Sequence, residues 1–448
     1  RHSFPTRRSS DLWIVFLVLH LTAFSESSWG AVNQLSLTDA ISIAQKNNPD
    51  LRKAELELGS SQWGQWEALS AHLPHLEVRG AHLLGARYSN LSVVFSGSPI
   101  QFPTAFPQTH LEIEASILLF DGLGSIHKYQ AARLTKEASQ LEMDDIQFKL
   151  EKNIQVKFFQ ALAAEELVKV ADQNIETLEQ HLNLVQASVR AGMSTQVDVL
   201  RIESQLEEAR AEKLLAEDNV WIGRQALIEV VGIEESDSPT LLGELPALKR
   251  KKLPEDLDLD LSLRRDFQAM ERRERAQDKL RAASDAFWFP KVSLFGTEQF
   301  LRYGAFDPVI LPNSSYQNAY SFGFQVSWNL FDGGRSIALE GKANNQAKMM
   351  KEDLRKLHLT SRQEFESWKR RFTYFVALYE ARKRSVRKSD ESVRLATAAV
   401  QAGLKTHSEV LDAELELFRA RAGVIRAQLG ALEAWIQIEL ASGKNIEI

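Results

Sequence analysis

The chain has 448 residues, of which 44% are hydrophobic and 25% are charged, and its formal net charge at pH 7 is −6. This weak acidity argues against the basic surface that a nucleic-acid-binding protein needs. The chain contains no cysteine, which excludes disulfide bonds, a thiol nucleophile, a zinc–cysteine site and a lipid on an N-terminal cysteine. Beyond the N-terminus, no stretch is long and apolar enough to cross a bilayer as a helix.

Residues 1–30 are predicted to be a signal peptide. Residues 13–24 form an apolar core of the usual length for such a segment, too short for a membrane span, and small residues precede Ala31. Residues 1–12 resemble a truncated or foreign end, so no part of the interpretation depends on them. The alternative is the start of a buried helix, but export is the interpretation that we favour.

The first half of the chain, residues 35–235, is predicted to contain a helix, two strands, a long helix and a shorter helix. Apolar residues at spacings of three and four indicate the first helix, and Pro74 ends it. Alternation with a period of two then indicates strands, which a proline-containing loop interrupts. The predicted ranges are 38–71 for the first helix, 75–120 for the strands and their loop, 125–190 for the long helix and 196–231 for the shorter helix.

A linker over 236–256 separates this half from a second one over 257–448. Prolines and a run of basic residues over 249–252 mark the linker, and we interpret the run as a solvated segment rather than a localisation signal. The second half repeats the order of the first. Its predicted elements are a helix over 257–288, two strands between 291 and 331, a long helix over 336–401 and a shorter helix over 407–440.

Matching motifs in register indicate that the two halves are repeats of one unit. Gly192 in Ala-Gly-Met-Ser-Thr returns as Gly403 in Ala-Gly-Leu-Lys-Thr, and the shift is 403 − 192 = 211 residues. Phe120 in Leu-Phe-Asp-Gly returns as Phe331 in the same four-residue motif, and 331 − 120 is again 211. Two motifs at one shift predict a duplication of about 200 residues, with two similar halves packed as one body.

The predicted helices are long enough to define an elongated molecule. At ~1.5 Å per residue, the helix over 125–190 would measure about 100 Å, and those over 196–231 and 38–71 about 54 and 51 Å. The two shorter helices together match the long one, so we expect them to stack end to end beside it. A coiled-coil scaffold without a pore would have the same helices, but it would leave the strands unexplained.

Each predicted strand alternates between an apolar face and a polar face over about ten residues. Large apolar residues alternate with small or polar ones over 320–330, and a similar pattern over 111–119 places Glu112 and Glu114 on the polar side. Half-buried strands of soluble sheets alternate in this way, but so do transmembrane barrel strands with lipid outside and water inside. Four strands are too few to close a membrane barrel, because small ones have about eight, so the chain is expected to oligomerise.

The repeat, the export signal and the paired Leu-Phe-Asp-Gly and glycine motifs resemble the TolC-type outer-membrane efflux proteins over residues 35–443. The resemblance implies a homotrimer with a mixed fold: a long periplasmic α-helical coiled-coil barrel, and a twelve-stranded transmembrane β-barrel with four strands from each protomer. It implies an exit duct in the outer membrane that serves a tripartite efflux pump or a type I secretion system. The implied partners are a periplasmic adaptor protein and an inner-membrane RND or ABC transporter, without any cofactor or metal.

The resemblance also assigns the turns between the long and shorter helices to the periplasmic tips, where the adaptor packs. The residues at these positions are Ala191, Gly192, Met193, Ala402, Gly403 and Leu404. Glycine at such a turn has a purely structural explanation too, because a tight turn between helices needs a left-handed backbone. The two roles are compatible.

Six residues beyond each glycine, the resemblance places an acidic residue at a constricted pore entrance. These residues are Asp198 and Glu409, and Asp412 lies three residues beyond Glu409 on the same side of the helix. Three-fold symmetry would turn each into a ring of carboxylates that favours cations. Stabilisation of a helix N-terminus is the alternative, which we favour for Asp198 because Arg201 occupies the place that matches Asp412.

Lys405 and Arg190 are close in sequence to the predicted entrance. We hypothesise that they form ion pairs with the carboxylates and so hold the entrance closed. Single substitutions that leave the resting conductance unchanged would contradict this hypothesis.

An enzymatic activity has little support in the sequence. The ten histidines are dispersed without a His-Glu-x-x-His motif, and the chain has no Gly-Lys-Ser/Thr phosphate-binding loop. Three hypotheses remain: an exit duct, which we favour, a periplasmic coiled-coil scaffold without a pore, and an envelope enzyme with an unusual site. A passive duct needs only polar pore-lining residues, so drug, metal and protein cargoes leave the same pattern in the sequence.

Overall fold

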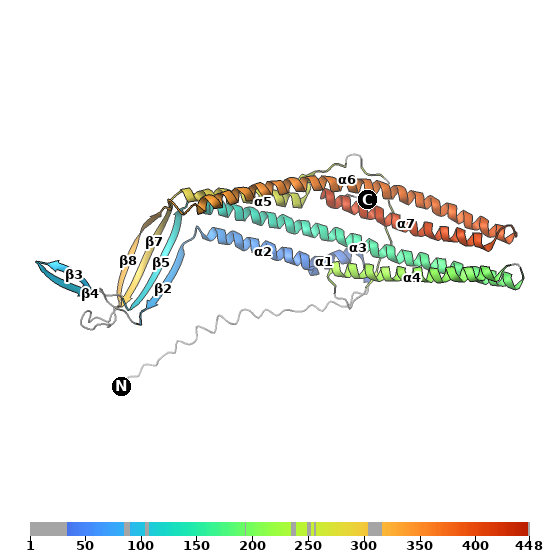
Figure 1. Ribbon diagram of the computed structural model, residues 1–448, viewed down its shortest axis with the longest axis horizontal. Coiled ribbons are helices and arrows are strands. Elements are labelled where there is room, and N and C mark those ends of the chain that lie inside the picture. Colours follow the sequence, from blue (N-terminus) through green and yellow to red (C-terminus); the bar gives the residue numbers. More distant parts are fainter. Residues whose placement is uncertain are drawn as a thin grey trace, which may run out of the picture.

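A computed structural model describes residues 34–84, 90–103, 107–192, 194–233, 239–248, 252–254, 257–302 and 316–446. The molecule is elongated, with long helices along its axis, a four-stranded sheet at one end and two helical turns, the tips, at the other (Figure 1). The predicted signal peptide over 1–30, Met193 of the first tip and most of the basic run in the linker lie outside the described residues.

The helices and strands follow one another in a similar order in each half of the chain. The elements of the first half are β1 (Gln34–Leu35), α1 (Leu37–Asn47), α2 (Pro49–Ser70), β2 (His75–His82), β3 (Asn90–Phe95), β4 (Ser98–Pro103), β5 (Thr109–Phe120), α3 (Gly124–Arg190) and α4 (Gln196–Val231). Those that follow are β6 (Thr240–Leu241), the 3₁₀ helix η1 (Leu261–Leu263), α5 (Arg265–Ser284), the 3₁₀ helix η2 (Asp285–Trp288), β7 (Lys291–Arg302), β8 (Gln317–Ser327), α6 (Arg335–Gln401) and α7 (His407–Ser442).

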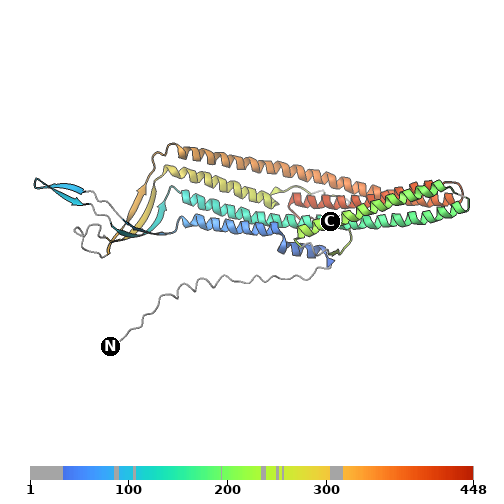
Figure 2. The same cartoon turned by 60° about the horizontal axis from the view of Figure 1, so that its bottom comes forward.

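Two helices of 67 residues each, α3 and α6, run the length of the helical part. Beside α3, α2 and α1 occupy the part nearer the sheet and α4 the part nearer the tip, and α5 and α7 are arranged in the same way beside α6 (Figures 1 and 2). The expected stacking of two shorter segments beside each long helix is therefore confirmed. No described helix is long and apolar enough to cross a membrane.

The helices form one layer with two open edges. Near the sheet, α2 contacts α3, α3 contacts α5 and α5 contacts α6; near the tips, α4 contacts α3, α3 contacts α7 and α7 contacts α6. The first edge therefore consists of α2 and α4, and the second edge consists of α6.

The sheet continues this order at the end of the helices. Its strands are arranged β2-β5-β7-β8, and every neighbouring pair is antiparallel (Figure 1). Because α2 leads into β2 and β8 leads into α6, each outer strand lies on the same side as an outer helix. The described strands thus leave β2 and β8 with one unpaired side each.

The first predicted helix, 38–71, is in fact two helices that meet at Asn48. Pro49 has no backbone N–H and begins α2, while the side-chain oxygen of Asn48 accepts hydrogen bonds from the N–H groups of Asp50 and Leu51. The prediction of one continuous helix was wrong here, because this proline and its cap outweigh the apolar periodicity on both sides of them.

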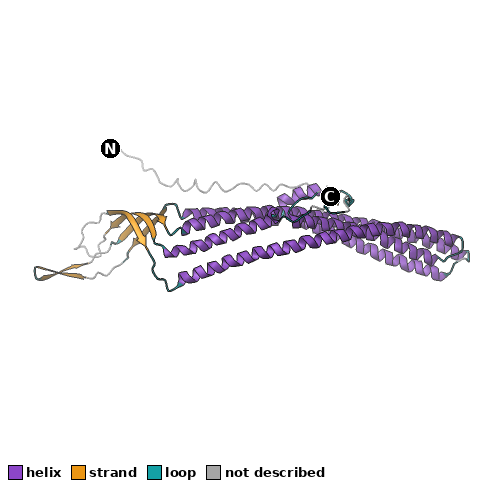
Figure 3. Ribbon diagram, turned by 90° about the horizontal axis from the view of Figure 1, so that it is seen from above, coloured by secondary structure: helices purple, strands orange, loops and turns teal. Residues whose placement is uncertain are grey.

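Three further segments differ from their predicted form. The proline-containing loop between the first strands includes the hairpin β3–β4, which projects beyond the four-stranded sheet (Figure 3). The helix predicted over 257–288 is shorter, because the 3₁₀ helices η1 and η2 flank α5. The final strand ends at Ser327, whereas the alternation of side chains continues to 330.

The core is densest where the two halves of the helical layer meet. Leu432 and Ile436 of α7 pack with Ile154 and Phe158 of α3 in one buried cluster. Within this region the Lys152 side chain donates a hydrogen bond of 2.8 Å to Glu439 Oε2, with side-chain exposures of only 4% and 7%. The pair joins α3 to α7 across 287 residues of sequence.

Candidate functional site

Each tip turns on a glycine in the left-handed backbone region. Gly192 has a φ of +72° and Gly403 a φ of +68°. A Cβ atom on either residue would meet no atom within 4 Å, so the backbone conformation rather than close packing requires glycine. Of the six tip residues predicted from the sequence, Ala191, Gly192, Ala402, Gly403 and Leu404 are exposed, whereas Met193 lies outside the described residues. Their role in docking an adaptor stays a prediction.

Asp198 serves as a cap at the N-terminus of α4. Its Oδ2 atom accepts hydrogen bonds from the backbone N–H of Thr195 at 3.0 Å, from the Thr195 hydroxyl at 2.7 Å and from Ser194 Oγ at 3.2 Å. These hydrogen bonds, the one from the Thr195 hydroxyl foremost, hold the pKa of Asp198 below its ordinary value. The geometry matches the structural explanation that the sequence favoured for this residue.

Glu409 occupies the equivalent place on α7 but has a different partner. Lys405 Nζ lies 2.6 Å from Glu409 Oε2, and α7 has no side-chain hydrogen bond from its cap residue Thr406. Asp412 follows on the same helix, and three of the four predicted entrance residues, Lys405, Glu409 and Asp412, line one depression of ≈ 900 Å³ on the α6–α7 hairpin. The structure thus brings Lys405, Glu409 and Asp412 together and leaves Asp198 out of this group.

A second cavity, of ≈ 540 Å³, lies between the two hairpins near their tips. Asp198 lines it from the first hairpin and Lys405 from the second, together with His181 and His407. Lys405 therefore borders both hollows. Arg190 was also expected to form an ion pair, but no carboxylate of the described chain lies within 4 Å of it.

Contacts that join the two hairpins were not predicted from the sequence. His181 of α3 and Glu414 of α7 are 2.5 Å apart, and their side chains are 13% and 6% exposed. Arg201 donates a hydrogen bond to Ser408 Oγ, and Leu411 is buried among apolar side chains of α3 and α4. His181 and Glu414 are 233 residues apart, so local sequence patterns carry no signal for their contact.

The sheet has a polar face that carries a cluster of charges. Arg79 lies within 4 Å of three carboxylates, at 2.7 Å from Glu77, 3.9 Å from Glu112 and 3.2 Å from Glu114. The register pairs Glu77 with Glu114 and Arg79 with Glu112, so these side chains share one face. Glu112 and Glu114 were expected on the polar side, whereas the central position of Arg79 was not predicted.

The opposite face of the sheet is mainly apolar and open, apart from Glu298, which the register pairs with Ile113 and Tyr320. Large side chains of β8 dominate it: Tyr320 is 75% exposed, Phe322 80% and Phe324 71%. Leu76 and Val78 of β2 are on the same face and are also more than half exposed. A sheet with a polar face and a wide apolar face suits a position between water and lipid.

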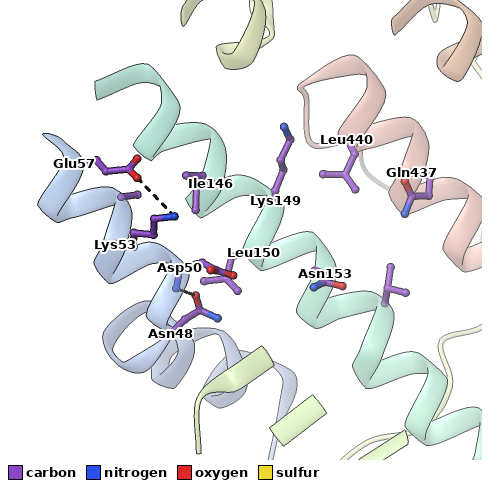
Figure 4. A pocket seen from close by; sticks show the side chains of 12 residues that line it. Asn48, Asp50, Lys53, Glu57, Ile146, Lys149, Leu150, Asn153, Gln437 and Leu440 are labelled. Carbon is purple, nitrogen blue, oxygen red and sulfur yellow. Dashed lines mark hydrogen bonds and ion pairs between the residues drawn. The ribbon is translucent and has the colours of Figure 1, made fainter. Parts of the chain in front are cut away.

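A third hollow, of ≈ 510 Å³, lies between α2, α3 and α7, far from the tips (Figure 4). Its charged residues have partners or caps nearby: Lys53 Nζ is 3.8 Å from Glu57, and the Asn48 side chain accepts a hydrogen bond from the N–H of Asp50. Among the residues whose positions are described, no group of three or more His, Asp or Glu side chains could hold a metal. The described residues of this hollow therefore offer no metal-binding group.

Comparison with known proteins gives a family match over both halves. The family model for outer membrane efflux proteins matches residues 40–233 and 257–444. The proteases secretion protein PrtF of Dickeya chrysanthemi is 23% identical over 440 residues, which cover 94% of this chain and 91% of that protein. The pyoverdine export outer membrane protein OpmQ of Pseudomonas putida is 24% identical over 422 residues, or 93% and 87% of the two chains.

Solved structures show the same fold. The outer membrane protein VceC from Vibrio cholerae superposes with a TM-score of 0.76 at 18% identity, covering 92% of this chain and 97% of that one. CusC is a protein whose structures concern the conformational changes that accompany folding and transmembrane channel formation. It superposes with a TM-score of 0.77 at 19% identity, covering 91% of this chain and 92% of that one. The expected fold of long helices joined to a four-stranded sheet is therefore confirmed for one protomer, whereas closure of three sheets into one transmembrane barrel stays a prediction.

Proposed function

The chain belongs to the outer membrane efflux protein family, and from this premise we propose that three copies form one exit duct through the outer membrane. The duct serves an efflux pump or a type I secretion system and moves substrates passively from the periplasmic side to the exterior. The energy comes from an inner-membrane transporter of the RND or ABC class, and a periplasmic adaptor links the two. Such a duct needs no catalytic group of its own.

The observation that carries this proposal is the pair of open edges on one protomer. Strands β2 and β8 each have an unpaired side among the described strands, and α2 and α6 lie at the matching edges of the helical layer. Open strand edges are not tolerated in lipid, so copies of the chain must close the sheet. Three copies supply 3 × 4 = 12 strands, which exceeds the minimum of about eight for a membrane barrel.

Closure assigns the two faces of the sheet. The exposed aromatic face of β8 turns to the lipid, and the face with Arg79, Glu112 and Glu114 lines the lumen. The opposite assignment would put Arg79, Glu77, Glu112 and Glu114 of each protomer into hydrocarbon, whereas this one puts only Glu298 of the described strands there, and each charge in hydrocarbon is costly. The barrel lumen therefore carries more carboxylates than cations.

The tips provide the docking end and the entrance. The exposed turns at Gly192 and Gly403 are the surface on which the adaptor packs. Three-fold symmetry repeats Glu409 and Asp412 into 2 × 3 = 6 carboxylates around the entrance, with Lys405 partly neutralising them. Asp198 contributes mainly by holding the start of α4.

The cargo is selected by the transporter rather than by this chain. Relatives of similar identity are named for secretion of proteases, export of pyoverdine and efflux of toluene. A polar pore with few specific groups accommodates such different substrates, and the energised partner imposes the choice.

Single-channel recording in planar bilayers tests the duct. The detergent-purified protein should give a cation-preferring conductance, and Glu409→Gln/Asp412→Asn should lower the cation-to-anion permeability ratio towards one. Asp198→Asn is the matched control. This substitution should leave the permeability ratio unchanged, because the Asp198 carboxylate caps a helix. An unaltered ratio in the double variant would refute the entrance assignment, and a trimer without any conductance would favour the pore-free scaffold.

A further inference from the structure

The mainly apolar face of the sheet becomes polar at the strand ends that lie farthest from the helices. The register pairs Arg302, the last residue of β7, with Thr109 of β5, and it pairs Thr109 with His82, the last residue of β2. The Thr109 hydroxyl and His82 Nδ1 are 2.9 Å apart, and Arg302 Cζ lies 5.9 Å from the centroid of the Tyr316 ring, just before β8. These four residues form the outer polar row of the sheet.

Glu298 lies on the same face, four residues before Arg302 in β7. Because side chains alternate along a strand, residues 298 and 302 point to one side of the sheet. The register sets Glu298 between Ile113 and Tyr320. Asn318 Nδ2 donates a hydrogen bond of 3.4 Å to Glu298 Oε1, and no cationic side chain of the described chain lies within 4 Å of this carboxylate. Glu298 thus keeps unused acceptor capacity in largely apolar surroundings.

The depth of Glu298 decides which groups can reach it. Four residues at ~3.3 Å each separate Glu298 from Arg302 by about 13 Å along the strand, which is about 10 Å of membrane depth for strands tilted by about 40°. The polar layer on one side of a bilayer is only about 5–7 Å thick. With Arg302 at the outer boundary of this layer, Glu298 therefore lies at the level of the hydrocarbon, where a charge without a partner is costly.

We propose that the outer polar row and Glu298 together bind the headgroup of a phosphorylated glycolipid. The Arg302 guanidinium binds the phosphate, because a guanidinium matches phosphate oxygens in a fork geometry and no carboxylate of the described chain lies within 4 Å of it. A hydroxyl or amide N–H group of the same headgroup, about 10 Å deeper, donates a hydrogen bond to Glu298. Both charges thereby gain a partner.

The occupant is a lipid because this face turns to lipid in the proposed barrel, so the inference rests on the proposed function. A phospholipid with one phosphate reaches only the outer polar row, since its polar layer ends above the level of Glu298. The head of a phosphorylated disaccharide with amide-linked acyl chains carries polar groups at both levels. The site therefore adds to the duct a class of lipid that its outer end selects.

Native mass spectrometry of the delipidated protein in detergent tests the site, with lipid A as the glycolipid and dioleoylphosphatidylglycerol as the phospholipid. The wild type should bind lipid A more tightly than the phospholipid. Glu298→Leu should lower the affinity for lipid A about tenfold and leave that for the phospholipid unchanged, because only the deeper contact is lost. Arg302→Gln should lower both affinities about tenfold, because both lipids carry a phosphate.

Lys291→Gln is the matched control, because Lys291 begins the same strand on the opposite face and should affect neither affinity. Glu298→Leu puts an apolar residue on the lipid side, and an unchanged trimer mass and conductance show that this variant is folded. Equal affinities of the wild type for the two lipids, or unchanged binding of lipid A by Glu298→Leu, would overturn the site, while a conducting trimer would leave the duct standing. A wild-type chain that neither trimerises nor conducts would overturn the barrel, and the site with it.

Discussion

Removing the positive partner of a buried ion pair should destabilise the whole helical part of this protein. Lys152 and Glu439 are 4% and 7% exposed and 2.8 Å apart, and Glu439 Oε1 also accepts the backbone N–H of Ile446 at 2.7 Å. Glu439 therefore connects α3, α7 and the segment after α7. The substitution Lys152→Met keeps the length of the side chain but leaves a buried carboxylate without its cation.

The cost of this change follows from the burial. Leaving one charge of a buried pair uncompensated costs about 3–5 kcal/mol. An unfolding entropy of about 2.1 cal/mol/K per residue, applied to a chain of this length, gives roughly 0.9 kcal/mol/K at the midpoint. Lys152→Met should therefore lower the thermal midpoint of the helical circular-dichroism signal by about 3–5 °C.

Two further variants separate this cause from a general loss of packing. Lys152→Met/Glu439→Gln removes both charges and keeps the acceptor for Ile446, so it should recover most of the lost stability. Lys169→Met is the matched control on the same helix, and it removes an exposed pair with Glu166, at 65% and 35% side-chain exposure, which is worth about 0–1 kcal/mol. A double variant less stable than Lys152→Met, or a shift by Lys169→Met as large as that by Lys152→Met, would refute the reasoning.

Two other substitutions test the packing and the cap. Gly430→Ala should lower the free energy of unfolding, measured by urea denaturation, by about 1–3 kcal/mol, because the new Cβ would lie 2.5 Å from Phe375 Cε1. A decrease below about 0.5 kcal/mol would be too small for such a clash and would contradict the prediction. Asp198→Asn should speed amide exchange at the start of α4 at neutral pH. The Thr195 hydroxyl lowers the pKa of Asp198 in the folded state, so the cap is fully present above about pH 4, the ordinary pKa of the group, and is lost as the pH falls through the pKa of the folded state. The difference in exchange rate between the variant and the wild type should therefore vanish at such low pH. Equal exchange rates at pH 7 would contradict the cap.

Local patterns in the sequence determined most of the secondary structure. The absence of proline and the apolar spacing predicted the long helices over 125–190 and 336–401, which are observed as Gly124–Arg190 and Arg335–Gln401. The two glycines at one shift of 211 predicted the tips, because a left-handed turn between helices is a local property of the backbone. The alternation in β5 and β8 likewise predicted which residues share a face of the sheet.

The two entrance carboxylates show where local patterns stop being sufficient. Asp198 and Glu409 occupy equivalent places in two repeats, each three residues after a threonine. Asp198 accepts hydrogen bonds from Thr195, whereas Glu409 pairs with Lys405, which stands where the first repeat has Ser194. The sequence already favoured a cap for Asp198, but only the folded tips show the hydrogen bonds that make it one and the depression that Lys405, Glu409 and Asp412 line together.

The tertiary structure alone decided which residues from distant segments meet. Lys152 with Glu439, and His181 with Glu414, are pairs separated by 287 and 233 residues, so no spacing within one helix could predict them. The same holds for the open edges at α4 and α6, since only the contacts between helices show which of them lie at the borders of the layer. Periodicity determines which residues share a side of a helix, but the packing of helices far apart in the sequence determines what that side faces.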